Sequence, residues 1–146
     1  MPVATSPPVA HVAAASPLGH AIVRRINAVR ARHGEHPVVL TARLRRLARH
    51  HTLDMLRHDR FSHDGDGTTF SQRIRARVHY RKVGETLATM PRRTSARRIV
   101  AAWMHSPSHR AVLLDPAYRR IGVSGASGRM GPDRAFAVTA DFSTWR

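Results

Sequence analysis

The sequence contains no cysteine among its 146 residues. This absence excludes disulfide bonds, thiol nucleophiles and cysteine-ligated zinc, and it leaves the redox environment of the protein undetermined. Any metal ion would have to be bound by histidine, aspartate or glutamate side chains. Long apolar runs are absent too. No segment approaches the ~20 apolar residues of a membrane-spanning helix.

Negative charge is scarce, because 25 lysine and arginine residues stand against only 9 aspartate and glutamate residues. The formal net charge of +16 favours binding to polyanions such as nucleic acid, anionic lipid or cell-wall polymer. The arginines occur as scattered pairs, however, and aromatic residues for base stacking make up only 5% of the chain. We therefore expect loose adhesion to anionic polymers and no specific recognition of nucleic acid. The alternative is a merely solvated surface, with arginine in place of lysine through codon bias.

The first 19 residues contain no lysine or arginine and are rich in proline, alanine, serine and valine. This composition predicts a disordered leader. The stretch "VAHVAAAS" resembles the end of a signal peptide, but the basic start and the unbroken apolar segment of such a peptide are missing. We therefore divide the chain into a leader or signal-peptide remnant, 1–19, and one domain, 20–146.

Helical periodicity, capping residues and turn residues predict helices flanking a few late strands. The predicted helices cover 17–33, 42–58, 69–77, a segment starting at Thr94 or Ser95, and 107–114; the extended segments cover 83–88, 120–126 and 135–142. The last two segments read as a hairpin around the turn 127–133. This pattern is typical of a layered α+β domain.

Several side chains receive a local role from this pattern. Trp103 is expected in the core, and Ser106 is expected to cap the helix that begins with Pro107. Further residues are expected at the surface or, for the histidines, on the wall of a cleft: Arg73, Arg75, Arg77, His50, His51 and His58.

Three stretches carry residues suited to chemistry: "RFSHDGDG" around His63, "VGETLA" around Glu85 and "WMHSPSHR" around His109. Two imidazoles and a carboxylate are ligands that zinc accepts, with one position left open. No local metal-binding, phosphate-binding or nucleophile motif covers these residues. In a chain with 11 histidines such a triple also arises by chance. Spacing alone therefore leaves a shared site open.

The order of segments resembles the bacterial branch of the CAP superfamily, the SCP-like extracellular domains. The matching pieces run from about 20 to 142: "INAVRARHG", "LARHHTLDMLRHDRFSHDG", "VGETLA", "WMHSPSHR", "YRRIGVS" and "AVTADF". The Phe-Ser-His and Trp-Met-x-Ser-Pro-x-His-Arg pieces are the specific ones. Two departures stand out, namely Thr86 where the family usually has asparagine, and no acidic residue a few positions after Trp103.

The resemblance implies a three-layer α-β-α sandwich with a mostly antiparallel sheet and a large cleft. It also implies that His63, Glu85 and His109 converge in that cleft. There His63 and His109 would bind zinc or another divalent metal, with Glu85 as a further ligand. The missing second acid leaves a fourth ligand in doubt.

Three functions follow for this domain. The first is a secreted or surface-exposed, monomeric, non-catalytic module that binds a metal, a small molecule, a lipid or a cell-wall polymer. The second is a metal-assisted hydrolase of peptide or cell-wall substrates, with Glu85 as the general base. The third is adhesion to polyanions, independent of the cleft. We favour the first, and the third is compatible with it.

Overall fold

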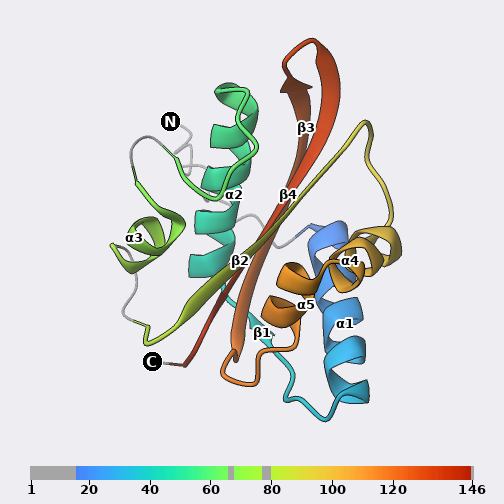
Figure 1. Ribbon diagram of the computed structural model, residues 1–146, viewed down its shortest axis with the longest axis vertical. Coiled ribbons are helices and arrows are strands. Elements are labelled where there is room, and N and C mark those ends of the chain that lie inside the picture. Colours follow the sequence, from blue (N-terminus) through green and yellow to red (C-terminus); the bar gives the residue numbers. More distant parts are fainter. Residues whose placement is uncertain (1–15, 66–67, 77–79, 146) are drawn as a thin grey trace, which may run out of the picture.

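A four-stranded sheet lies between two layers of helices in the computed structural model, which describes residues 16–65, 68–76 and 80–145 (Figure 1). The elements in chain order are α1 (Pro17–Arg32), β1 (Val39–Leu40), α2 (Ala42–Arg57), α3 (Phe70–Arg75), β2 (Val83–Met90), α4 (Ala96–His105), α5 (Pro107–Leu113), β3 (Arg120–Met130) and β4 (Asp133–Ser143). Helices α2 and α3 cover one face of the sheet, and α1, α4 and α5 cover the other. The predicted α-β-α sandwich is therefore confirmed.

The strands are arranged in the order β1-β3-β4-β2. Strand β4 pairs antiparallel with both β2 and β3, whereas the short β1 pairs parallel with β3. The sheet is thus mixed, with antiparallel pairing around β4. Because β4 is flanked on both sides, the side chains of its central residues are enclosed by neighbouring strands and by the helical layers.

The β3–β4 hairpin is longer than the sequence pattern predicts. Strand β3 continues to Met130 and β4 begins at Asp133, so the expected turn 127–133 shrinks to Gly131 and Pro132. Gly131 has a φ of 64°, which glycine adopts without steric cost. The outer half of β3 is rich in serine, glycine and arginine and alternates between exposed and half-buried residues. Such residues give no apolar pattern by which a strand is recognised.

Helix starts follow the local capping chemistry of the sequence. The side chains of four N-cap residues accept hydrogen bonds from the first turn: Ser16, Thr41, Thr69 and Ser95. Ser106 is different, because its side chain makes no capping hydrogen bond and its Oγ lies 3.5 Å from Oγ of Ser108. Ser106 thus occupies the predicted N-cap position of α5, with Pro107 at the first helical position, but its side chain does not cap the helix.

The Asn-x-x-Arg piece of α1 stabilises two loops. Asn27 exchanges two hydrogen bonds with the backbone of Val38, at 3.0 and 2.8 Å. Arg30 is fully buried, and its guanidinium donates to backbone carbonyls of two loops. Those carbonyls belong to His36, Leu113, Asp115 and Tyr118. With its donors bonded in this way, the buried cation does not face an apolar core unpaired.

The main core lies between the sheet and the layer of α1 and α4. Trp103 is 1% exposed there, and its Nε1 donates to the carbonyl of Leu87 at 2.9 Å, which confirms its predicted core position. On the opposite face, α2 approaches β3 at Gly122. A Cβ atom at Gly122 would lie 2.1 Å from the backbone nitrogen of Arg45. Only glycine permits this close packing of helix on strand.

The predicted leader falls largely outside the described residues, since these begin at Ser16 and α1 begins at Pro17. Among the helices described, none combines the length and apolar character that crossing a bilayer requires.

Candidate functional site

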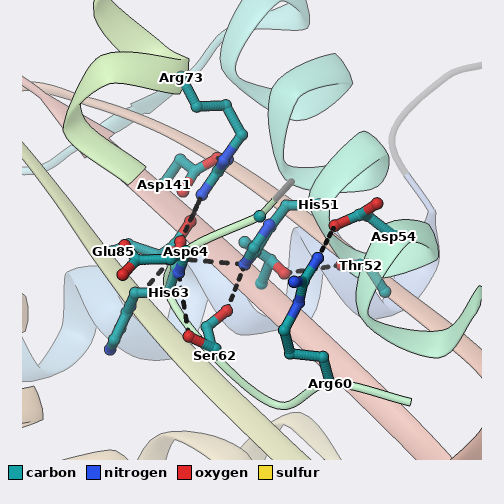
Figure 2. A network of polar contacts seen from close by, with 12 residues as sticks. His51, Thr52, Asp54, Arg60, Ser62, His63, Asp64, Arg73, Glu85 and Asp141 are labelled. Atoms are coloured by element: carbon teal, nitrogen blue, oxygen red, sulfur yellow. Dashed lines mark hydrogen bonds and ion pairs between the residues drawn. The ribbon is translucent and has the colours of Figure 1, made fainter. Parts of the chain in front are cut away.

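Glu85 is the centre of a buried polar network (Figure 2). It lies on β2, and its side chain is 0% exposed. Its Oε1 accepts a hydrogen bond from Nδ1 of His63 at 2.9 Å, and its Oε2 accepts one from Nη2 of Arg73 at 2.7 Å. The structure thus brings the predicted residues His63 and Glu85 into direct contact. Both carboxylate oxygens already have a partner.

The segment that follows α2 positions His63. Its neighbour Ser62 is anchored by His51, whose Nε2 donates to the carbonyl of Ser62 at 2.8 Å. The His63 ring also packs at 5.8 Å, between ring centroids, against Phe70. His51 is fully buried, and its Nε2 lies 3.7 Å from Oε1 of Glu85. Of the two expected positions, surface or cleft wall, the surface position is therefore wrong for His51, which lies on the same face of α2 as the buried Met55.

Arg73 is a part of the network that sequence reasoning assigned to the surface. Its side chain is 11% exposed, and Figure 2 shows it reaching from α3 toward Glu85 and Asp141. It also donates to the carbonyl of His63 at 3.3 Å. The expected exposure is wrong for Arg73 and correct for Arg75, while residue 77 lies outside the described residues. Arg73 directly precedes the buried Ile74 on α3, a helix that contacts β2.

Asp141 completes the network from β4. It lies opposite Glu85 in the β2–β4 ladder and is fully buried, and its Oδ2 lies 3.9 Å from Nη1 of Arg73. Asp141 is not among the site residues predicted from the sequence. The available signal was a lone acidic residue in the run "AFAVTADF", which is otherwise free of charge.

Burial and neighbouring charges shift the pKa values of Glu85 and Asp141 in opposite directions. Burial raises the pKa of Asp141 well above its usual range, and the charge of Glu85 and a hydrogen bond to it raise this pKa further. For Glu85, burial also acts to raise the pKa, but hydrogen bonds from His63 and Asp141, with the charge of Arg73, outweigh it and lower the pKa. At neutral pH, Glu85 is therefore ionised and Asp141 holds the proton between them.

His109 lies on α5, a helix that contacts β2, and it is half-buried. Burial lowers its pKa, and positive charge on His63 lowers this pKa further. His109 is therefore an electrostatic neighbour of His63 and is neutral near pH 7. The other predicted surface histidines, His50 and His58, are indeed exposed. We call the group of His63, Glu85 and His109 the His63 site.

The hydrogen bonds of the His63 site determine what it can do chemically. Because the ionised Glu85 only accepts, Nδ1 of His63 carries the proton, and Nε2 is left with the lone pair in the neutral ring. A carboxylate orienting an imidazole in this way is the usual support of a metal-ligating histidine. In contrast, Glu85 itself has both oxygens bonded and no solvent exposure. It is poorly placed to take a proton from water.

The groups that would hold a divalent cation are Nε2 of His63 and the ring of His109. Across residues 16–65, 68–76 and 80–145, no cluster of three or more His, Asp or Glu side chains has an arrangement able to hold a metal ion. Two imidazoles alone are fewer protein ligands than the three or four of the usual zinc sites.

Residues 23–142 match the family described as CAP, the cysteine-rich secretory protein family. The chain belongs to this family. It is 30% identical over 104 residues to the uncharacterized protein YkwD of Bacillus subtilis, an alignment that covers 70% of this chain and 40% of YkwD. The CAP domain thus spans well under half of that relative's length.

Solved structures confirm the CAP fold. An outer surface protein of Borrelia burgdorferi has a TM-score of 0.70 and 22% identity, covering 84% of this chain and 90% of the Borrelia protein. An extracellular SCP-domain protein of Bacillus anthracis has a TM-score of 0.70 and 24% identity, covering 86% and 40% of the two chains. Manganese-bound Ac-ASP-7 has a TM-score of 0.60 and 14% identity, covering 90% and 70%.

Proposed function

We propose that this CAP domain is a non-catalytic, monomeric binding module that holds a divalent cation between His63 and His109. The observation that carries the proposal is the hydrogen bond of 2.9 Å from Nδ1 of His63 to Glu85. This bond directs the lone pair of His63 away from Glu85. It also engages the one carboxylate that a hydrolase would need as its base.

The electrostatics of the His63 site support cation binding. Burial keeps the pKa of His109 low, so its ring is neutral and able to ligate at neutral pH. The ionised Glu85 strengthens His63 as a donor without occupying a coordination position. Imidazole ligands suit zinc and other first-row transition metals. The manganese in the related Ac-ASP-7 structure supports the same role for the fold.

We place the protein outside the cytoplasm, in a secreted or surface-exposed form. The family is described as secretory, the Borrelia burgdorferi protein as an outer surface protein, and the Bacillus anthracis protein as extracellular. A cation site built from histidines alone suits such a location, because it needs no reduced thiol.

The test of the cation site is calorimetric titration of the full chain with zinc and with manganese. We expect His63→Ala and His109→Ala each to weaken binding at least about tenfold, and Glu85→Gln to weaken it by about 10–100-fold. His105→Ala is the matched control, because His105 is exposed at the end of α4. Equal affinity in wild type, His63→Ala and His109→Ala would overturn the proposal.

A second candidate function is the binding of an acyl chain. A pocket of about 330 Å³ lies between α1 and α4, with an apolar floor that includes Val29, Val100 and Met104. Arginines line it as well, among them Arg25 and Arg97, and their charge suits the carboxylate of a fatty acid.

Filling this pocket tests the acyl-chain function. Ala101 lines the pocket and is exposed, so Ala101→Phe should block a fluorescent fatty acid while leaving the fold intact. Ala102→Phe is the matched control on the same helix, outside the lining. Fatty-acid binding that Ala101→Phe leaves unchanged would remove this candidate.

A further inference from the structure

A second pocket, separate from the His63 site, lies between α2 and α3. It has a volume of about 600 Å³, and neither His63 nor His109 is among the residues that line it. Three lining residues, Arg43, Arg46 and His50, follow one another on α2 at spacings that place them on one face of the helix. Arg73 lines the pocket from α3. We call this cavity the α2–α3 pocket.

The positive charge in the α2–α3 pocket is largely uncompensated. Neither Arg43 nor Arg46 has an ion-pair partner in the described part of the chain, and both are exposed. Asp54 is the one acidic side chain among the described lining residues. Its carboxylate already lies 3.4 Å from His58 and 3.6 Å from Arg60. Two free guanidinium groups on one helix face form an attractive site for an anion.

The wall of the pocket also presents a buried acceptor. His51 lines the pocket and is fully buried. Its Nε2 donates to the carbonyl of Ser62, so Nδ1 carries the lone pair of the neutral ring. This Nδ1 has no hydrogen-bond partner among the described residues, and it lies 3.9 Å from where a Cβ of the lining residue Gly65 would stand. A buried acceptor without a partner favours a ligand that brings a hydrogen-bond donor.

We propose that the α2–α3 pocket binds a small hydroxylated organic phosphate, of the polyol phosphate class. Arg43 and Arg46 hold the phosphate through charge-assisted hydrogen bonds, for which the planar guanidinium is well suited. Nδ1 of His51 accepts a hydrogen bond from a ligand hydroxyl. The pocket volume lies within the range of small-molecule sites.

Phosphate alone would use only the arginines, whereas a neutral polyol would use only His51. The pocket therefore favours a ligand that carries both groups, and this selectivity separates it from general adhesion of a basic surface to anions. The pocket shares no residue with the His63 site, although Arg73 bonds to Glu85 from its wall. Cation binding at the His63 site can thus fail while phosphate binding here holds, or the reverse.

The experiment is calorimetric titration of the full chain at fixed ionic strength, with glycerol 1-phosphate, inorganic phosphate and glycerol as probes. We expect glycerol 1-phosphate to bind most tightly, inorganic phosphate at least about tenfold more weakly, and glycerol not at all at the same concentrations. The double variant Arg43→Gln, Arg46→Gln should lose at least about tenfold in affinity for glycerol 1-phosphate.

The matched control is the double variant Arg49→Gln, Arg57→Gln. Both of these arginines are exposed on α2 and lie outside the pocket lining, so the charge lost is the same. This control should bind glycerol 1-phosphate within about twofold of wild type. An equal loss in the two double variants, or no binding of glycerol 1-phosphate by wild type, would overturn the site. Equal affinity for glycerol 1-phosphate and inorganic phosphate would overturn the role of His51.

Discussion

Glu85 and Asp141 lie directly opposite each other in the β2–β4 ladder, and both carboxyl groups are buried. Two ionised carboxylates could not share this position, because their repulsion in a buried setting is too large. The pair persists with one negative charge, which Arg73 offsets and to which His63 donates a hydrogen bond. The network that orients His63 therefore depends on a proton held by Asp141 and on one guanidinium.

The proton on Asp141 predicts a pH-dependent stability. Burial raises the pKa of Asp141 in the folded state, whereas the unfolded chain releases this proton near the ordinary value of about 3.9. The folded state binds more protons, so the contribution of Asp141 to the free energy of unfolding falls as the pH rises above about 4. Asp141→Asn cannot titrate, and its amide can donate to Glu85. We expect this variant to gain stability relative to wild type as the pH rises from 4 toward 7, by at most about 1.4 kcal/mol for each pH unit up to the folded pKa.

Urea unfolding at several pH values measures this difference. Asp133→Asn is the control, because Asp133 is exposed at the start of β4 and should leave the pH profile of wild type unchanged. A constant offset between wild type and Asp141→Asn across the range would show that Asp141 is ionised in the folded state.

Arg73 is predicted to stabilise the fold as well as the site. In Arg73→Met, Glu85 remains ionised and buried without its cation, and we expect a loss of about 3–5 kcal/mol in the free energy of unfolding at pH 7. Because the pKa of Glu85 is lowered in the folded state, its favourable contribution is present above the ordinary glutamate value. That contribution disappears as the pH falls through the folded value. The loss should therefore shrink in acid.

Arg75→Met is the matched control, because Arg75 is exposed on the same helix. It should change the free energy of unfolding by no more than about 0.5 kcal/mol. If Arg73→Met proved as mild as Arg75→Met in urea unfolding, the network would not depend on this guanidinium.

Local chemistry in the sequence predicts the helices well, and long-range contacts explain what it misses. Thr41 and Thr69 mark helix starts because a cap acts within three residues. The two-residue strand β1 exists only through its pairing with β3, about 80 residues away. No local pattern reports such a contact.

The residues of the candidate site also fall into two groups, those that a local motif marks and those that only long-range contacts select. Family motifs single out His63 and Glu85, and the structure places Nδ1 of His63 2.9 Å from Oε1 of Glu85. Arg73 and Asp141 carry no motif, because each is selected by partners on other elements. An arginine among neighbouring arginines and an aspartate at a strand end look like surface residues until the sheet brings them together.

Adhesion to polyanions can be tested at an arginine cluster that the structure shows at the end of the β3–β4 hairpin. Four arginines line a groove of about 370 Å³ there: Arg92, Arg93, Arg129 and Arg134. Changing all four to glutamine lowers the formal net charge from +16 to +12 (16 − 4 = 12) and should shift elution from a heparin column to lower salt. A control variant loses four exposed arginines elsewhere, and it should elute at higher salt than the variant of the hairpin cluster. These four are Arg24, Arg49, Arg57 and Arg98. Equal shifts would assign adhesion to net charge alone, and retention of wild type that is insensitive to salt would contradict adhesion altogether.

Gly122 gives the sharpest prediction for the fold that supports the site. A Cβ atom there would lie 2.1 Å from backbone atoms of α2, which cannot move as a flexible side chain would. Gly122→Ala must therefore push α2 away from β3. Because His51 lies on α2, it would move away from Glu85 as well. We expect a loss of at least about 3 kcal/mol in the free energy of unfolding, measured in urea at pH 7.

Gly19→Ala supplies the matched control for the same substitution. A Cβ at Gly19 of α1 would have its nearest contact at 3.4 Å, which ordinary packing accepts. Alanine also favours the helix over glycine, so this variant should gain up to about 1 kcal/mol. Opposite signs for the two Gly→Ala changes follow from the packing of α2 on β3, whereas a similar, small effect at both positions would mean that α2 does not lie against Gly122.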